Sequence, residues 1–156
     1  MKQRIRLLAL WTALAGGLNL VWEIIQLPLY AIYYETDLLE IASAVVHCTL
    51  GDALIALSSY LLAAAATRSW NWPAERTVPG AAVAVVAGLG YTAFSEWLNV
   101  SVRGSWAYSP AMPQFFGLGL SPLLQWLVLP LIGLLIFRAL GRRMIDLNQV
   151  RTGRTG

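Results

Sequence analysis

Four long apolar segments, separated by short polar stretches, dominate the hydrophobic pattern of this 156-residue chain. A helix needs about 20 mostly apolar residues to cross the roughly 30 Å hydrocarbon core of a bilayer, and each segment is long enough. The pattern therefore predicts an all-α fold: a single membrane domain built as a four-helix bundle. The predicted spans are residues 7–30, 41–66, 79–101 and 118–140, followed by a basic tail over residues 141–156.

Polar residues interrupt two of these spans at helical spacing. Steps of four, three and four residues place such side chains on one face of an α-helix. An ionisable group inside an apolar helix costs a few kcal/mol in lipid, so each stripe indicates a partner or a water-filled pocket. The stripes are Asn19, Glu23, Gln26 and Tyr30 in the first span, and Thr92, Glu96, Asn99 and Arg103 at the end of the third.

The polar side chains of all four spans are expected at similar depth. Counting about 1.5 Å per residue from the outer end of each span, Glu23, His47, Glu96 and Gln125 lie roughly 8 to 12 Å deep, and Asp52 about 16 Å. The sequence therefore predicts one polar layer in the outer leaflet. His47 and Asp52 lie about 140° apart around an ideal helix, so they are expected to flank a wide pocket.

The composition supports a lipid environment, because 58% of the residues are hydrophobic and only 12% are charged. The net charge of +3 does not indicate nucleic-acid binding, because ten of the eleven basic residues lie near the N-terminus, between the second and third spans, or at the end of the chain. With four spans these places share one side, so the positive-inside rule predicts cytoplasmic termini.

A secretory signal peptide is the competing interpretation of the N-terminus. Basic residues precede an apolar run there, and Ala13-Leu14-Ala15 resembles a cleavage site. The apolar character continues well past Ala15, which favours a retained first span. The lone Cys48 excludes an internal disulfide, and the chain has no Cys/His motif of the zinc-finger type.

The aromatic residues suggest further assignments. Trp11, Tyr30 and the Tyr33-Tyr34 pair suit the two membrane interfaces. The second outer loop, residues 102–117, is rich in proline and aromatics, which predicts an irregular cap rather than a helix. Within this loop Trp106 and Tyr108 are expected to cover the polar layer.

Three hypotheses account for the layer. In the first it is a membrane-embedded active site for a lipid, an isoprenoid or another hydrophobic small molecule, without a cofactor. A carboxyl group in a low-dielectric pocket can act as a general acid while a second carboxylate or an imidazole acts as the base. The catalytic candidates are Glu23, His47, Asp52 and Glu96, and the substrate-binding candidates are Asn19, Gln26, Asn99, Trp106, Tyr108 and Gln125.

The second hypothesis is a divalent metal held by Glu23, His47, Asp52 and Glu96, since carboxylates and imidazole suit zinc, manganese or iron. No span carries the Glu-x-x-His pair that di-iron bundles usually provide. In the third hypothesis the chain is a structural subunit or an assembly factor, and its polar residues only join the helices.

Several sequence runs carry a family resemblance. WEIIQLPLY, HCTLGD, FSEWLN, SWAYSPAMP and GLGLSPLLQW, within residues 18–130, resemble a group of small bacterial four-span membrane proteins with no established activity. The resemblance supports the four-span prediction. From the spans and the charge pattern we expect a multi-pass protein of the bacterial inner membrane, with membrane lipid as a partner and a second copy of the chain or another membrane protein as a candidate partner. Glu96, followed by Gly-x-Trp-x-Tyr and Pro, is similar to a pattern in membrane carotenoid hydratases, which implies isoprenoids among the substrates.

Overall fold

The computed structural model describes the backbone of residues 2–151 and the side chains of residues 4–140. This part of the chain is all-α apart from one two-stranded hairpin, and four of its helices are long and apolar enough to cross a membrane. The four apolar segments predicted from the sequence are thus confirmed as helices. The four are α1 (Lys2–Gln26), α3 (Leu38–Thr67), α5 (Thr77–Glu96) and α6 (Leu120–Arg151).

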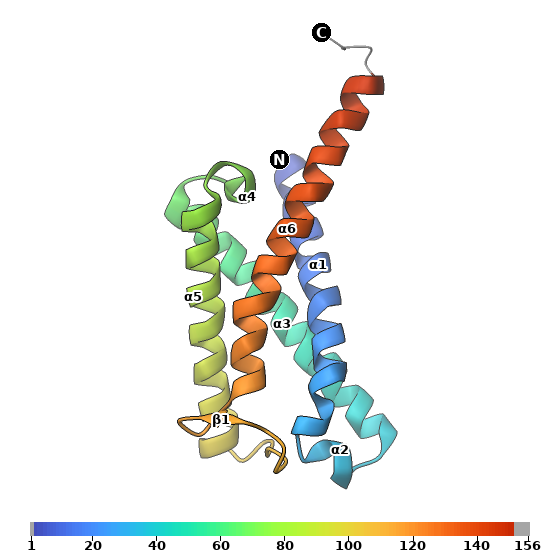
Figure 1. The fold of residues 1–156 in the computed structure, drawn as a ribbon, viewed down its shortest axis with the longest axis vertical. Helices are drawn as coiled ribbons and strands as arrows, with labels where there is room; N and C mark the ends of the chain where they lie inside the picture. The colour runs from blue at the N-terminus through green and yellow to red at the C-terminus, as the bar shows by residue number, and fades with distance from the viewer. Residues whose placement is uncertain (1, 152–156) are drawn as a thin grey trace.

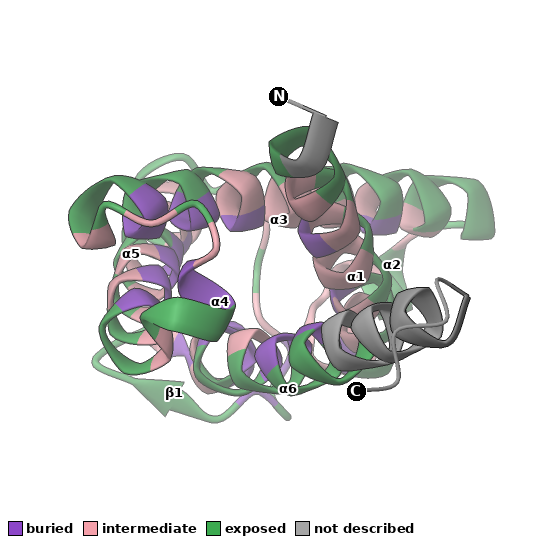
Figure 2. Ribbon diagram, turned by 90° about the horizontal axis from the view of Figure 1, so that it is seen from above, coloured by how far each residue is buried: buried purple, intermediate pink, exposed green. Residues whose placement is uncertain are grey.

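The four helices form a ring. The helices α1 and α5 stand at opposite corners, and each packs against both α3 and α6 (Figure 2). The helix α3 crosses behind the other three at a steep tilt (Figure 1). The start of α1 and the end of α6 lie at the same end of the ring, which we call the inner end.

Short elements connect the long helices. The helix α1 ends at Gln26, two residues before Pro28, and the chain continues as a 3₁₀ turn, η1 (Leu27–Leu29), and a one-turn helix, α2 (Ile32–Glu35). Asp37 then caps α3, because its carboxylate accepts 2.9 Å hydrogen bonds from the backbone N–H groups of Leu39 and Glu40. At the inner end the one-turn helix α4 (Trp72–Glu75) joins α3 to α5.

The last helix is longer than the sequence pattern predicted. The basic tail was placed at residues 141–156, but α6 continues through Arg151. Arginine, methionine, leucine and glutamine, all good helix formers, are frequent over residues 141–151, so the change from apolar to polar composition does not end the helix. Residues 152–156 lie outside the described part of the chain.

Aromatic side chains fill the inner end of the ring. Trp11, Tyr60, Trp72 and Phe137 come from four different helices, and the ring centres of Tyr60, Trp72 and Phe137 lie 5.6, 5.6 and 5.8 Å from that of Trp11. Trp11 is therefore a core residue of the inner end. Its indole N–H donates to the backbone oxygen of Ala56 at 3.2 Å, which satisfies its polar atom inside the core.

The outer end is covered by irregular chain, as predicted for the second outer loop. The helix α5 passes into one stretch of π-helix, η2 (Trp97–Val102), and the loop that follows leads to a hairpin of β1 (Gln114–Phe115) and β2 (Leu118–Gly119). Between them the loop pairs with the end of α1. Tyr30 and Tyr108 form an antiparallel bridge, and Ser109 donates from its hydroxyl to the Pro28 carbonyl at 2.9 Å.

Candidate functional site

A cavity of about 880 Å³ occupies the outer half of the ring. All four long helices and the outer loop contribute to its wall. Most of the polar side chains predicted from the sequence face it, so the expected convergence of polar groups in one layer is what the structure contains. They are Glu23, Gln26, His47, Asp52, Glu96, Asn99, Trp106 and Gln125.

Gln125 joins α1, α3 and α6 at the base of this layer. Its side-chain nitrogen lies 2.7 Å from the Asn19 amide oxygen, 2.9 Å from an Asp52 oxygen and 3.2 Å from a Glu23 oxygen. One Glu23 oxygen and one Asp52 oxygen both contact the Gln125 nitrogen, at 3.2 and 2.9 Å. These two oxygen atoms therefore lie within about 6.1 Å of each other. Glu23 and Asp52 therefore form a carboxyl pair.

The Glu23 side chain is oriented by Gln26, one helical turn further along α1. The Gln26 nitrogen donates to the same Glu23 oxygen at 2.8 Å. The Gln26 oxygen in turn accepts from the Ser121 hydroxyl of α6 at 2.8 Å and from the Trp22 indole at 3.2 Å. Because both ends of the Gln26 amide are engaged, it holds Glu23 in place and also ties α1 to α6.

Glu96 occupies the opposite side of the cavity and is 6% exposed. It accepts a hydrogen bond from the Tyr108 hydroxyl, which itself accepts from the Gly119 N–H at 2.8 Å. A β-carbon at Gly119 would lie 2.9 Å from the Tyr108 ring, so glycine is required for this approach. Burial, and then the hydrogen bond to Glu96, raise the pKa of Tyr108 above its ordinary value, which keeps the phenol a neutral donor.

The π-helix η2 begins directly after Glu96. Such stretches are rare and occur frequently at functional sites. Here it turns the chain from α5 into the covering loop, so that Glu96, Asn99 and Trp106 all face the cavity. The sequence predicted a regular helix to residue 101 and gave no signal for this change of winding.

His47 and Asn99 occupy different positions in the layer from the carboxyl groups. His47 is exposed and lies at the edge of the cavity, with Arg103 as the other basic lining residue. The Asn99 nitrogen bonds within its own helix, to the backbone oxygen of Ser95 at 2.9 Å and to its hydroxyl at 3.2 Å. Asn19 is buried below the cavity and reaches it only through Gln125.

Further residues of the wall were not among the predicted site residues. Tyr30, which the sequence suggested as an interfacial residue, lies at the cavity, with its ring centre 5.7 Å from that of Tyr108. Thr92 and Ser59 are buried in the same wall. Both Tyr30 and Thr92 belong to the polar stripes defined by helical spacing, so spacing predicted the lining residues better than residue type did.

Three sides of the cavity are closed by close contacts. Between α1 and α6 lie the Gln26–Ser121 and Asn19–Gln125 hydrogen bonds. Between α5 and α6 the Trp126 ring packs directly on Gly88, where a β-carbon would lie 2.1 Å from it. The aromatic core closes the inner end.

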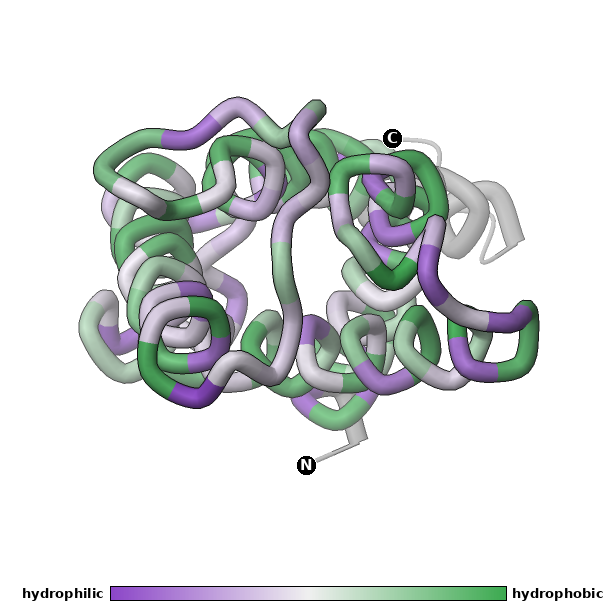
Figure 3. The backbone as a smooth tube through the Cα atoms, turned by 90° about the horizontal axis from the view of Figure 1, so that it is seen from below, coloured by the Kyte–Doolittle hydropathy of each residue, from purple (hydrophilic) through white to green (hydrophobic). Residues whose placement is uncertain are grey.

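The loop that follows α5 crosses the outer end of the ring (Figure 3) and is held by a 2.9 Å hydrogen bond from the Ala31 N–H to the Ala107 carbonyl. Exposed lining residues lie on α3 and α5, among them His47, Leu54 and Tyr91, and also at the outer end, where Arg103 and Ser105 are exposed. The cavity therefore opens sideways, between α3 and α5, as well as at the outer end.

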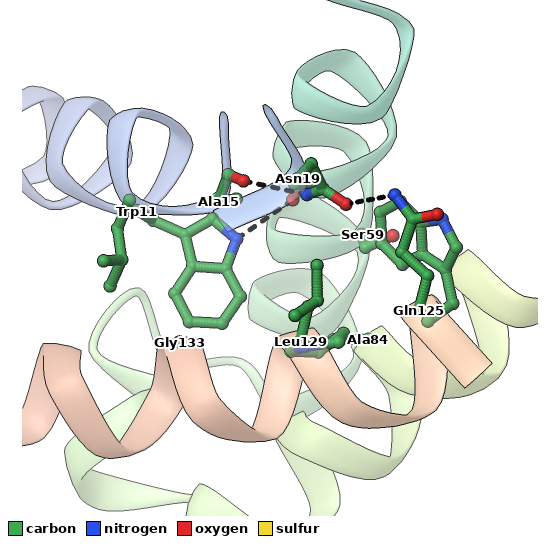
Figure 4. Close-up of a pocket in the computed structure, with 12 residues that line it drawn as sticks. Trp11, Ala15, Asn19, Ser59, Ala84, Gln125, Leu129 and Gly133 are labelled. Carbon is green, nitrogen blue, oxygen red and sulfur yellow. Dashed lines mark hydrogen bonds between the residues drawn. The ribbon is translucent and has the colours of Figure 1, made fainter. Parts of the chain in front are cut away.

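A second, smaller cavity of about 20 Å³ lies between the polar layer and the aromatic core (Figure 4). Asn19, Ser59 and Gln125 contribute polar atoms to its wall, and Trp11 and Leu129 contribute apolar ones. This volume is sufficient for one water molecule with polar partners. Ser59, Gln125 and Trp126 line both cavities, so the two adjoin.

Among the side chains of residues 4–140, no group of three or more histidine, cysteine, aspartate or glutamate residues is arranged to hold a metal ion. Glu23, Asp52, Glu96 and His47 line one cavity but do not form such a group. Comparison of the chain with family models, with curated proteins and with solved structures gave no match.

Proposed function

We propose that this protein spans the bacterial inner membrane four times, with both termini in the cytoplasm, and that its cavity binds a lipid-soluble molecule and acts on it by acid–base chemistry. The observation that carries the proposal is the sideways opening of a cavity lined by the carboxyl groups of Glu23, Asp52 and Glu96. A ligand that reaches these groups between α3 and α5 would come from the bilayer.

The charge distribution supports the orientation. Arg4, Arg68 and Arg76 belong to the inner end, where the Arg4 guanidinium lies 4.9 Å from the centre of the Trp70 ring. Placing this end in the cytoplasm satisfies the positive-inside rule. The polar layer then lies in the outer leaflet, and the opening between α3 and α5 faces lipid.

The arrangement of the carboxyl groups supports acid–base chemistry. The carboxyl groups of Glu23 on α1, Asp52 on α3 and Glu96 on α5 line one cavity, and Glu96 is bonded to Tyr108 of the outer loop. A proton donor on one side of a bound molecule and an acceptor on the other is the arrangement that general acid–base catalysis requires. Glu23 and Asp52, held by Gln125, would form one partner, and Glu96, bonded to Tyr108, the other.

The wall of the cavity suits a hydrophobic or amphiphilic substrate. Its outer part carries the carboxyl and amide groups, whereas its inner part is formed by apolar side chains such as Leu54, Ile55, Leu62 and Ala87. A long hydrocarbon chain would fit the inner part, with its reacting end among the carboxyl groups. An isoprenoid is one such molecule, as the resemblance of the Glu96 region to carotenoid hydratases implies.

Mass spectrometry of co-purifying lipids tests this proposal. Glu96→Gln preserves the shape of the side chain but removes its acid–base function, so we expect the variant to fold and to retain an unreacted molecule that the wild type converts. The wild-type sample would contain the product in its place. Identical bound molecules in both samples would contradict catalysis by Glu96, and the absence of any enriched molecule would contradict the ligand site.

A further inference from the structure

The β1–β2 hairpin carries two exposed phenylalanines at its turn. Phe115 pairs with Leu118, so Phe116 and Gly117 alone form the turn between the strands. Phe116 is 91% exposed, more than any other large hydrophobic side chain of residues 4–140, and Phe115 is 59% exposed. Their ring centres lie 4.6 Å apart. We call this aromatic pair, Phe115 and Phe116, the hairpin tip.

The backbone of the turn does not favour a phenylalanine. The φ angle is 51° at Phe116 and 79° at Gly117. A two-residue hairpin turn with positive φ at both positions favours asparagine, aspartate or glycine at the first of them, and a positive φ is unusual for a bulky side chain. Burial does not compensate for this conformation, because the Phe116 ring is exposed. Unfavourable backbone positions of this kind are found most often at functional sites.

The base of the hairpin is firmly held, in contrast to its turn. The Leu120 N–H donates to the Pro113 carbonyl at 2.8 Å, and the Gly119 N–H donates to the Tyr108 hydroxyl at 2.8 Å. The Tyr108 hydroxyl donates in turn to Glu96. The tip therefore projects from a base that is fixed to the wall of the cavity.

The hairpin lies beside the long helices rather than beyond them. The strand β2 is followed directly by α6, where the apolar stretch Leu120–Leu140 begins. Seen along the ring, β1 lies outside it, next to α5 and α6 (Figure 2). In the perpendicular view β1 is level with the outer end of α5 (Figure 1). With the four helices across a bilayer, this position is the headgroup region of the outer leaflet, where aromatic side chains are enriched.

The loop that carries the tip is uncharged. No charged residue occurs between Arg103 and Arg138 in the sequence. The connection between α1 and α3 at the same end is shorter, yet it contains Glu35 and Asp37. About a quarter of the residues of soluble domains are charged, so a water-facing loop of this length would contain several. The composition of the loop thus favours an apolar neighbour for the tip.

We propose that the hairpin tip is a membrane anchor, whose two phenylalanine rings insert among the lipids of the outer leaflet. The proposal rests on the four-span part of the proposed function and is independent of the ligand and its chemistry. Two phenylalanine side chains bury at most about 500 Å². A stable protein interface needs roughly 800 Å² from each partner, whereas insertion into lipid has no such minimum. Lipid therefore suits the tip better than a protein partner does.

Spin labelling of the full chain in phosphatidylcholine nanodiscs tests the anchor. A nitroxide in lipid collides with dissolved oxygen, and a nitroxide in water collides with a polar nickel complex. The label is attached to Phe116→Cys at the tip, to Glu35→Cys as the water control and to Leu131→Cys of α6 as the lipid control, all exposed positions. Each protein also carries Cys48→Ser, so that the native thiol is not labelled.

We expect the label at position 116 to resemble the Leu131 control, with nickel collisions several-fold rarer than at Glu35. Frequent nickel collisions at position 116 would place the tip in water and overturn the anchor. Rare collisions with both reagents would show that protein covers the tip, which would also overturn it. Frequent nickel collisions at Leu131 would contradict the four-span proposal itself.

A second pair of proteins tests the native Phe116 ring. The label is moved to Phe115→Cys, and position 116 is either phenylalanine or, in Phe116→Asn, the residue that suits the positive φ. The hairpin should keep its turn in both proteins. We expect nickel collisions at position 115 to rise several-fold in Phe116→Asn, because the second inserted ring is lost. Equal collision rates in the two proteins would show that Phe116 does not insert.

Discussion

The two ends of the ring differ in how closely their side chains pack and in how polar they are. At the inner end the rings of Trp11, Tyr60 and Trp72 pack with their centres 5.4 to 5.6 Å apart, edge to face for Trp11 and Trp72 and tilted for the other two pairs. At the outer end the same four helices enclose about 880 Å³ and line it with carboxyl and amide groups. The comparison teaches that a small bundle can keep a hollow, polar half because the other half is closely packed around large aromatic side chains.

The largest effect is expected from removing an aromatic side chain of the inner end. Trp72 is 0% exposed and contacts both Trp11 and Tyr60. We expect Trp72→Ala to lower the free energy of unfolding by about 3–5 kcal/mol, because the vacated volume cannot be refilled. Ser121→Ala at the outer end removes only the hydrogen bond to Gln26 and should cost about 0.6 kcal/mol.

Reversible unfolding in mixed micelles measures both variants. Equal losses for Trp72→Ala and Ser121→Ala would contradict the division into a stabilising end and a hollow end. The division would be supported further if Ser121→Ala still bound ligand at a temperature at which Trp72→Ala is unfolded.

A smaller effect is expected where the two ends meet. A β-carbon at Gly88 would lie 2.1 Å from the Trp126 ring, whereas one at Gly90 would meet nothing within 4 Å. Gly88→Ala should therefore destabilise the protein by about 1–3 kcal/mol through displacement of Trp126. Gly90→Ala should be neutral or stabilise by up to about 1 kcal/mol, since alanine favours helix. Thermal unfolding of the pair checks this, and equal melting temperatures would be inconsistent with the close α5–α6 contact.

A third effect, smaller than those of Trp72→Ala and Gly88→Ala, concerns the outer end and depends on pH. The pKa of Tyr108 is raised above its ordinary value of 10.0 by burial and by its bond to Glu96, so folding favours the protonated phenol. Its contribution to stability is complete below pH 10 and declines as the pH rises above this value toward the folded-state pKa. Tyr108→Phe should lower stability by about 1 kcal/mol at neutral pH.

Unfolding of Tyr108→Phe and of the wild type should be followed from pH 8 to 11. The difference between the two proteins should shrink above pH 10. A constant difference over this range would show that the hydroxyl is not held in its protonated form by the fold.

The sequence predicted the large features because they depend on composition and periodicity. The four helices follow from the length of the apolar runs, and the convergence of Glu23, Asp52 and Glu96 follows from their depth and spacing. The pattern of polar and apolar residues does not indicate which side chain each residue contacts. Trp11 and Tyr30 suit an interface by residue type, yet contacts from distant segments place one in the core and the other at the cavity.

Two features of the site had no signal in the sequence. The π-helix after Glu96 depends on how the covering loop is attached, through contacts far apart in the chain. The Gln125 nitrogen contacts three oxygen atoms from two other helices. These contacts form only if the helices are aligned along their axes to within about one hydrogen-bond length. Counting residues along a helix does not reach this precision.

The bridge between Tyr30 and Tyr108 has a mechanical consequence. It ties the outer ends of α1 and α5, which stand at opposite corners of the ring, through a chain segment rather than through direct packing. Three walls are thereby joined at the outer end, and the short α2 connection joins the start of α3 to the same end of α1. The width of the ring at this end is therefore set by the lengths of two connecting segments, so lengthening either segment would change the size of the cavity.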